Sequence, residues 1–121
     1  MPNQKKILIA EENGEFLRNM LNAFRGFGFE CITVAKDGAE VLNAIEKYSP
    51  DVVVMESFMA RFDALAVMQR MQSAKLQKKP CFTVLVNAMN ESLEQQMISS
   101  GAAYCFIKPV DMKSFTERIM Q

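Results

Sequence analysis

Residues 51–59 read Asp-Val-Val-Val-Met-Glu-Ser-Phe-Met, a short apolar run followed at once by an acid, Glu56. Runs rich in Val, Ile and aromatic residues are typical of β-strands. Similar runs lie on both sides of this one, at intervals long enough to hold a helix each. The predicted strands are Ile7–Ala10, Cys31–Ala35, Val52–Met55, Cys81–Val86 and Tyr104–Ile107.

Apolar residues between these runs recur with the spacing of one helix face. These residues are Phe16, Leu17, Met20, Leu21 and Phe24, then Val41, Leu42, Ile45 and Tyr48, then Leu65, Met68 and Met71, and finally Phe115 and Ile119. Strands that alternate with helices need crossover connections, and these make the sheet parallel. The sequence therefore predicts an α/β fold, a doubly wound (βα)5 domain with a five-stranded parallel sheet.

Polar and small residues mark the ends of the predicted helices. Asp37 followed by Glu40 indicates an N-cap with a capping box for the second helix. Gly26 and Gly28 indicate the end of the first helix and the turn that follows it. Asp111 is a candidate N-cap for the last helix, which reaches the end of the sequence without a capping residue. We expect residues 1–121 to form one domain excised from a longer protein.

The composition excludes several classes of function. The chain has 121 residues, no histidine, and 14 acidic against 14 basic residues. Without histidine there is no Ser-His-Asp or Cys-His catalytic group and no His-ligated metal. A net charge of zero argues against direct binding of nucleic acid. The three cysteines form no C-x-x-C motif, and we expect free thiols in a cytoplasmic protein without a signal peptide or membrane span.

Charged residues follow three of the predicted strands. Glu11 and Glu12 follow the first, Glu56 follows the third, and Lys108 follows the fifth. In a doubly wound sheet the functional crevice lies at the carboxyl ends of the strands. Clustered carboxylates suit Mg²⁺, and a nearby lysine suits a phosphoryl group. The alternative is that these acids are solvated loop residues. A nucleotide or flavin site is not expected, because residues 11–14 form no glycine-rich loop.

The run Gly101–Pro109, Gly-Ala-Ala-Tyr-Cys-Phe-Ile-Lys-Pro, resembles the G-A-x-x-aromatic-x-x-K-P run of response regulator receiver domains. The acid pair after the first strand and the segment Asp51–Met59 extend this resemblance over essentially the whole chain. Within the family, residues 101–112 are most similar to the receivers of master sporulation regulators of spore-forming bacteria. The resemblance implies the flavodoxin-like strand order 2-1-3-4-5.

The resemblance also implies roles for individual positions. Receivers accept a phosphoryl group from a histidine kinase or phosphotransferase on an Asp at the end of the third strand, which corresponds to Glu56. The Mg²⁺ ligands of the family correspond to Glu11, Glu12 and Glu56 and the backbone carbonyl of Phe58. The family's invariant lysine corresponds to Lys108, whose bond to Pro109 is then expected to be cis.

The functional positions depart from the family pattern. All three acids are Glu where the family has Asp, which is part of a total of ten Glu and four Asp. The hydroxyl that ends the fourth strand is replaced by Val86, which cannot bond a phosphate. The aromatic switch residue is replaced by Cys105, and Tyr104 is expected on the opposite side of the strand.

Each Glu adds one methylene and moves its carboxylate by about 1.5 Å, which crowds a metal and phosphoryl site. We therefore hypothesise a built-in ion pair between Glu56 and Lys108 that holds the domain in one state. The sequence favours a non-enzymatic pseudo-receiver, a dimerisation and protein-interaction module for an output domain. A decayed scaffold, a working Mg²⁺-dependent phosphoacceptor and a small-ligand sensor in the same crevice remain alternatives.

In receivers the usual interaction surface is the fourth helix, fifth strand and fifth helix. We expect a protein partner or a second copy of the chain there, and no membrane. The candidate residues of this surface are Met89, Met97, Tyr104, Phe106, Met112 and Phe115, although core packing is the expected role of most of them.

Overall fold

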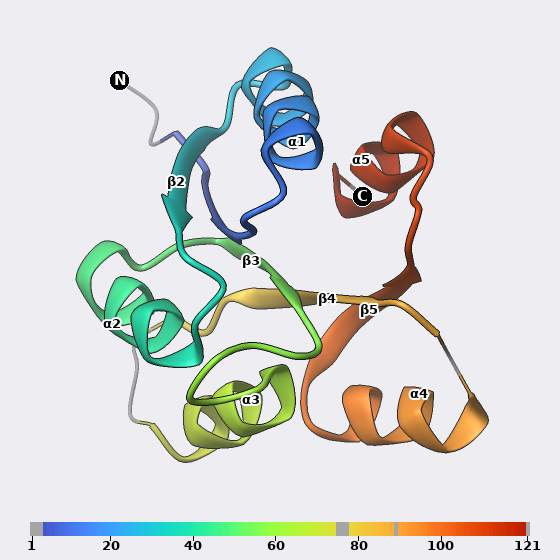
Figure 1. Ribbon diagram of the computed structural model, residues 1–121. Coiled ribbons are helices and arrows are strands. Elements are labelled where there is room, and N and C mark those ends of the chain that lie inside the picture. The colour runs from blue at the N-terminus through green and yellow to red at the C-terminus, as the bar shows by residue number, and fades with distance from the viewer. Residues whose placement is uncertain (1–3, 75–77, 89, 121) are drawn as a thin grey trace.

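The computed structural model describes residues 4–74, 78–88 and 90–120. Strands and helices alternate along the whole chain (Figure 1). The strands are β1 (Lys6–Ala10), β2 (Glu30–Val34), β3 (Val52–Glu56), β4 (Cys81–Val86) and β5 (Ala102–Ile107). The helices are α1 (Gly14–Gly26), α2 (Gly38–Tyr48), α3 (Ala64–Ser73), α4 (Glu91–Ser99) and α5 (Met112–Met120). The predicted succession of elements is confirmed, with strand boundaries within about two residues of those expected.

All strands are parallel, and the sheet order is β2-β1-β3-β4-β5, as expected. The chain therefore starts at an inner strand, moves to one edge and then crosses β1 to build the other half of the sheet. The crossing point lies between β1 and β3, where Ala10 pairs with Met55. This topological switch point is where doubly wound sheets place their sites.

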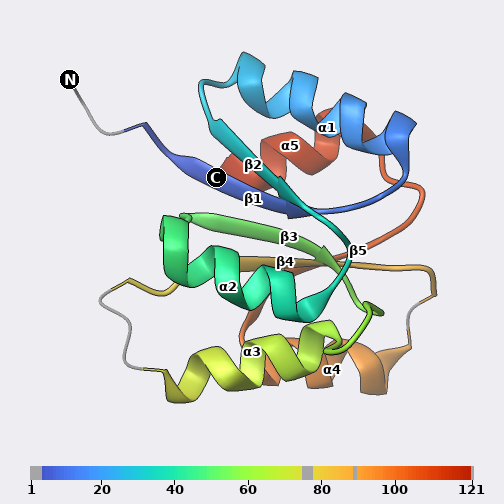
Figure 2. The same ribbon diagram turned by 60° about the vertical axis from the view of Figure 1, so that its left-hand side comes forward.

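Helices cover both faces of the sheet (Figure 2). On one face, α1 and α5 pack through Phe24 and Phe115, whose rings meet edge to face at 6.1 Å. On the other face, α2, α3 and α4 contribute residues such as Ile45, Met68 and Met97 to a separate core cluster. The two clusters bury the apolar stripes that the sequence displays, and this burial is the main stabilising term of the fold.

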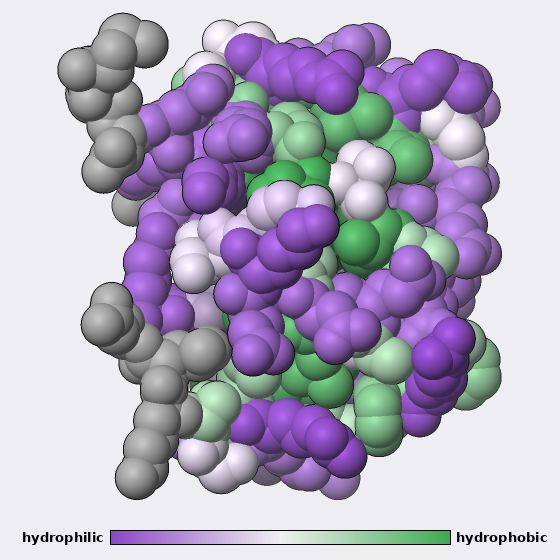
Figure 3. Space-filling model, turned by 90° about the vertical axis from the view of Figure 1, so that its left-hand side faces the viewer, coloured by the Kyte–Doolittle hydropathy of each residue, from purple (hydrophilic) through white to green (hydrophobic). Residues whose placement is uncertain are grey.

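The inner strands are more buried than the edge strands. Every residue of β3 is buried, whereas β2 and β5 are partly exposed along their length. The face along β2 and α2 is accordingly mostly hydrophilic, with apolar groups visible between hydrophilic ridges (Figure 3). An unbroken apolar run such as Val52–Met55 is the sequence pattern of a parallel strand covered on both sides.

Local capping follows the sequence with one exception. Asp37 caps α2 by accepting a hydrogen bond from the Ala39 amide at 2.8 Å. The expected capping box is wrong. In a capping box the Glu40 side chain would accept a hydrogen bond from the Asp37 amide, but this amide donates to the Ala35 carbonyl. Asp111 caps α5 through the Ser114 amide. No helix among the described residues is long and apolar enough to cross a membrane.

Candidate functional site

Three charged residues meet at the carboxyl edge of the sheet. Glu11 follows β1, Glu56 is the last residue of β3, and Lys108 follows β5. The two acids are neighbours because β1 pairs with β3. β4 separates β3 from β5, so Lys108 must reach over two strand spacings, roughly 10 Å, to meet them. The long lysine side chain covers that distance above the end of β4.

The three side chains form a compact ion cluster. Nζ of Lys108 lies 2.5 Å from Oε1 of Glu56 and 3.1 Å from Oε1 of Glu11. The two acidic side chains are almost inaccessible, at 8% exposure for Glu56 and 2% for Glu11. The predicted ion pair between Glu56 and Lys108 is therefore confirmed, and Glu11 is a second partner of the same ammonium.

Backbone and aromatic contacts hold Lys108 in this position. Its amide donates to the Val86 carbonyl at 2.8 Å, which continues the β4–β5 ladder by one residue. Its bond to Pro109 is cis, as the resemblance implied. Its ammonium also lies 4.9 Å from the centre of the Phe16 ring, in the first turn of α1. The spacing of Phe16 in the sequence predicts only a place in the apolar stripe of α1, and no local signal predicts this contact.

Burial and charge act differently on the pKa values of the two acids. Burial, together with its hydrogen bond with Glu56, raises the pKa of Glu11. Burial also acts to raise the pKa of Glu56, but hydrogen bonds from Lys108 and Glu11 outweigh it and the pKa is lowered. Burial acts to lower the pKa of Lys108, and the two acids outweigh it and raise that pKa. Glu56 is thus the principal anion of the cluster.

Glu12 lies outside the cluster, which corrects the expectation that three acids converge. Its side chain is exposed, and Oε1 accepts a hydrogen bond from the Lys36 amide at 3.3 Å. Only Glu11 of the acid pair therefore contacts Lys108.

In this arrangement Lys108 competes with Mg²⁺ for one oxygen of each buried carboxylate. A magnesium site uses carboxylate oxygens as ligands, but both buried carboxylates already pair with the Lys108 ammonium. Within residues 4–74, 78–88 and 90–120, no three acidic, cysteine or histidine side chains are grouped so that they could hold a metal ion. Phe58 lies in the loop after β3 with 79% of its surface exposed.

The two switch positions are apolar or small and pack in the core. Val86 is 1% exposed and belongs to the hydrophobic core on the face of α2, α3 and α4. Cys105 packs against the same core. Tyr104 faces the other side, with its ring 6.2 Å from that of Phe106 and within 5.6 Å of the Arg118 guanidinium. The predicted placement of Tyr104 opposite Cys105 is confirmed.

The loops after β2 and β3 are joined beside the cluster. Asp37 and Ala60 form an isolated parallel bridge, and the Gly38 amide donates to the Ala60 carbonyl at 2.9 Å. Asp37 also pairs with Arg61, whose Nε lies 3.0 Å from Oδ2. A Cβ atom on Gly38 would lie 2.1 Å from the Phe62 carbonyl oxygen, so only glycine fits there. These contacts hold the loop that follows Glu56.

The described candidate residues of the expected interaction surface are buried or partly buried, which agrees with the core packing expected for most of them. Met97 and Phe115 are buried in the core, at 2% and 1% exposure. Met89 lies outside the described residues. Among the described residues, the large apolar side chains exposed in this region are Ile98 of α4 and Ile107 of β5, each about half exposed, and Met120 of α5, which is 39% exposed. The helical period of 3.6 residues does not by itself predict that Met97 is buried and that its neighbour Ile98 is exposed.

A doubly wound sheet of order 2-1-3-4-5, with acids after β1 and β3 and a lysine after β5, defines a receiver-type domain. The family model of the response regulator receiver domain matches residues 7–120, and the chain belongs to this family.

Solved structures agree on the fold. The chemotaxis response regulator CheY4 of Vibrio cholerae superposes with a TM-score of 0.86 at 18% identity, covering 98% of each chain. The receiver domain of the response regulator NarL from Mycobacterium tuberculosis superposes with a TM-score of 0.85 at 18% identity, covering 98% of this chain and 95% of that one. A DNA-binding response regulator of the LuxR family from Staphylococcus aureus gives 0.83 at 18% identity, covering 96% of each.

Proposed function

We propose that this chain is a pseudo-receiver, a signalling module that works without phosphorylation and has no catalytic activity of its own. One observation carries the proposal: Nζ of Lys108 lies 2.5 Å from Oε1 of Glu56, the residue at the phosphoacceptor position. The pair is nearly closed to solvent on the Glu56 side. The domain is held in one state because the lysine already has the anionic partner that a phosphoryl group would otherwise provide.

The pair also opposes phosphoryl transfer chemically. A carboxylate attacks phosphorus with an oxygen lone pair, and one lone pair of Glu56 Oε1 is engaged by an ammonium. The lowered pKa of Glu56 makes it a weaker nucleophile. Even a misplacement of about 1 Å costs on the order of a hundredfold in rate, and the additional methylene of Glu exceeds that.

In this proposal the domain transmits its signal by associating with another protein chain. We infer that the surface formed by α4, β5 and α5, with Ile98 and Ile107 exposed on it, contacts a second copy or another protein. The output is an attached domain that the receiver regulates. A transcriptional output is supported by the S. aureus relative, which is described as DNA-binding, and by the similarity of residues 101–112 to sporulation regulators.

The decisive experiment is incubation of the purified chain with Mg²⁺ and acetyl phosphate, followed by intact mass measurement. We expect an unchanged mass, while a receiver with Asp at this position gains one phosphoryl group under the same conditions. Retention of Lys108 favours the alternative, a working phosphoacceptor. A phosphoryl adduct that disappears in Glu56→Gln would establish that alternative and reject the pseudo-receiver.

A further inference from the structure

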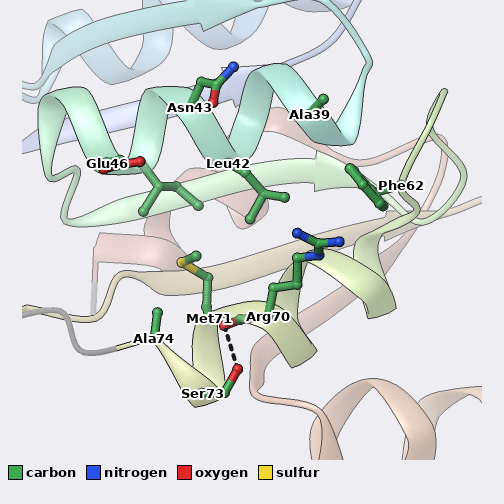
Figure 4. A pocket seen from close by; sticks show the side chains of 10 residues that line it. Ala39, Leu42, Asn43, Glu46, Phe62, Arg70, Met71, Ser73 and Ala74 are labelled. Atoms are coloured by element: carbon green, nitrogen blue, oxygen red, sulfur yellow. Dashed lines mark hydrogen bonds between the residues drawn. The ribbon is translucent and has the colours of Figure 1, made fainter.

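A large cavity lies away from the ion cluster, between α2 and α3 (Figure 4). Its volume is about 710 Å³, within the range of roughly 300–1,000 Å³ that is usual for small-molecule sites. The cavity is a groove between the two helices, and Phe62 of the loop before α3 lies at one end of it. The following side chains line it: Ala39, Leu42, Asn43, Ile45, Glu46, Phe62, Arg70, Met71, Ser73 and Ala74.

The groove has an apolar interior. Ile45 is buried at its base, and Leu42, Phe62 and Met71 are half-buried around it. Figure 4 shows Leu42 and Met71 approaching each other from the two helices across the middle of the groove. Binding of an apolar body in such a groove is favourable, because it removes the surface of these side chains from water.

Arg70 provides the positively charged group of the groove. Its guanidinium lies 4.6 Å from the centre of the Phe62 ring, and Figure 4 shows the side chain extending from α3 toward α2 at the level of Phe62. A guanidinium has five N–H donors, so a cation–π contact with one ring leaves donors for a carboxylate. Among the described residues, the ion pairs involve Glu11, Asp37, Asp51 and Glu56, and none of these acids pairs with Arg70.

We propose that the α2–α3 groove binds a small organic monocarboxylate with an apolar body. The carboxylate pairs with the in-plane donors of Arg70, and the apolar body lies over Leu42, Ile45 and Met71. Glu46 lies at the opposite end of the groove from Phe62, and its charge disfavours a second carboxylate there. This binding goes beyond the proposed function and does not depend on whether Glu56 is phosphorylated.

The groove is joined to the ion cluster through the loop after β3. Phe62 lies in this loop, next to Arg61, which pairs with Asp37 at the start of α2. The same loop begins directly after Glu56. A ligand that packs against Phe62 therefore touches the segment that follows the phosphoacceptor position.

The test uses two probes, 3-phenylpropionate and octanoate, with 3-phenylpropionamide as the uncharged match of the first. Each is titrated into the ¹⁵N-labelled chain, and amide chemical shifts are followed. We expect both carboxylates to cause saturable shifts that are largest in α2, α3 and the loop holding Phe62. We expect the amide to bind at least tenfold more weakly, because it lacks the charge that pairs with Arg70.

Two variants and a matched control localise the carboxylate. Arg70→Gln removes the charge at an exposed position, and Arg70→Lys keeps the charge but loses the planar fork. We expect Arg70→Gln to weaken binding of both carboxylates at least tenfold and Arg70→Lys to weaken it less. Arg118→Gln is the control, because Arg118 also stacks on an aromatic ring, Tyr104, but lies outside the groove. It should bind both probes as the original chain does.

Three results would overturn the proposal. The first is the absence of saturable shifts at the groove with either carboxylate up to several millimolar. The second is equal affinity of the original chain and Arg70→Gln, which would show nonspecific apolar contact. The third is a concentration-dependent dimer, seen by sedimentation, that Arg70→Gln abolishes, because a second copy would then cover the groove. None of these results bears on the phosphorylation test above.

Discussion

Oε1 of Glu56 lies 2.5 Å from Nζ of Lys108, although the two residues belong to strands separated by β4. The ammonium contacts Glu11 as well, at 3.1 Å, so one positive charge serves two buried acids. Such a cluster is sensitive to the removal of any member, because an isolated buried charge is costly.

Loss of the lysine should be the most damaging change to the cluster. In Lys108→Met, two buried carboxylates lose their partner, and we expect a stability loss of about 3–5 kcal/mol near pH 7. The loss should shrink in acid, because protonation removes the unpaired charges. Urea denaturation at neutral and acidic pH measures both effects. Lys113→Met, at an exposed position, should change stability by no more than about 0.5 kcal/mol. Equal effects of the two changes would contradict the importance of the cluster.

The two acids should affect opposite limbs of the pH–stability curve. Glu56 has a lowered pKa, so its contribution is present above the ordinary Glu value and is lost as pH falls through the lowered one. Glu11 has a raised pKa, so its ionisation costs stability as pH rises from the ordinary value through the raised one.

Glutamine variants should separate these limbs. Glu56→Gln should flatten the acid limb and cost roughly 1.5–3 kcal/mol near pH 7, the usual value for a hydrogen bond to a charged group. Glu11→Gln should flatten the other limb, with stability near pH 7 unchanged or increased. The measurement is urea denaturation at a series of pH values. A larger loss in Glu11→Gln than in Glu56→Gln would show that Glu11 is the principal anion.

Gly38 should tolerate no side chain. Gly38→Ala places a Cβ 2.1 Å from the Phe62 carbonyl oxygen, and we expect a loss of about 1–3 kcal/mol from overpacking. Gly26→Ala is the matched change, since a Cβ there meets nothing within 4 Å, and it should stabilise the chain by up to about 1 kcal/mol. Thermal denaturation of both variants tests the pair. A neutral Gly38→Ala would mean that the loop after β3 moves freely away from α2.

The cap of α2 should matter more than the ion pair beside it. Asp37→Ala removes the acceptor for the Ala39 amide and should cost about 1 kcal/mol, whereas Asp37→Ser keeps a capping oxygen and should cost less. Arg61 is largely exposed, and its φ of 66° suits glycine.

The arginine variant completes this comparison. Arg61→Gly loses the ion pair but relieves the backbone, and its net change should stay within about 0.5 kcal/mol. Denaturation by urea with and without high salt measures the electrostatic share. A cost for Arg61→Gly as large as that for Asp37→Ala would assign the stabilisation to the ion pair.

The sequence by itself determined the succession of strands and helices. The runs around Val52–Met55 and Cys81–Val86 are apolar without interruption, which is the pattern of strands buried on both faces. Residues that cap helices act within one turn, so Asp37 and Asp111 are recognisable from their neighbours alone. The strand order, the placement of Glu56 beside Lys108 and the cis bond before Pro109 came from the resemblance to a family, because they depend on contacts between distant segments.

Only the tertiary structure decided which charged residues meet. Glu11 and Glu12 are adjacent acids with the same side chain, and the turn after β1 sends one into the cluster and the other to the Lys36 amide. Phe16 appears as one more apolar residue of a helix stripe until the packing of α1 brings it over Lys108. Side-chain direction at a strand end is set by the elements that pack around it, and a local pattern does not record those contacts.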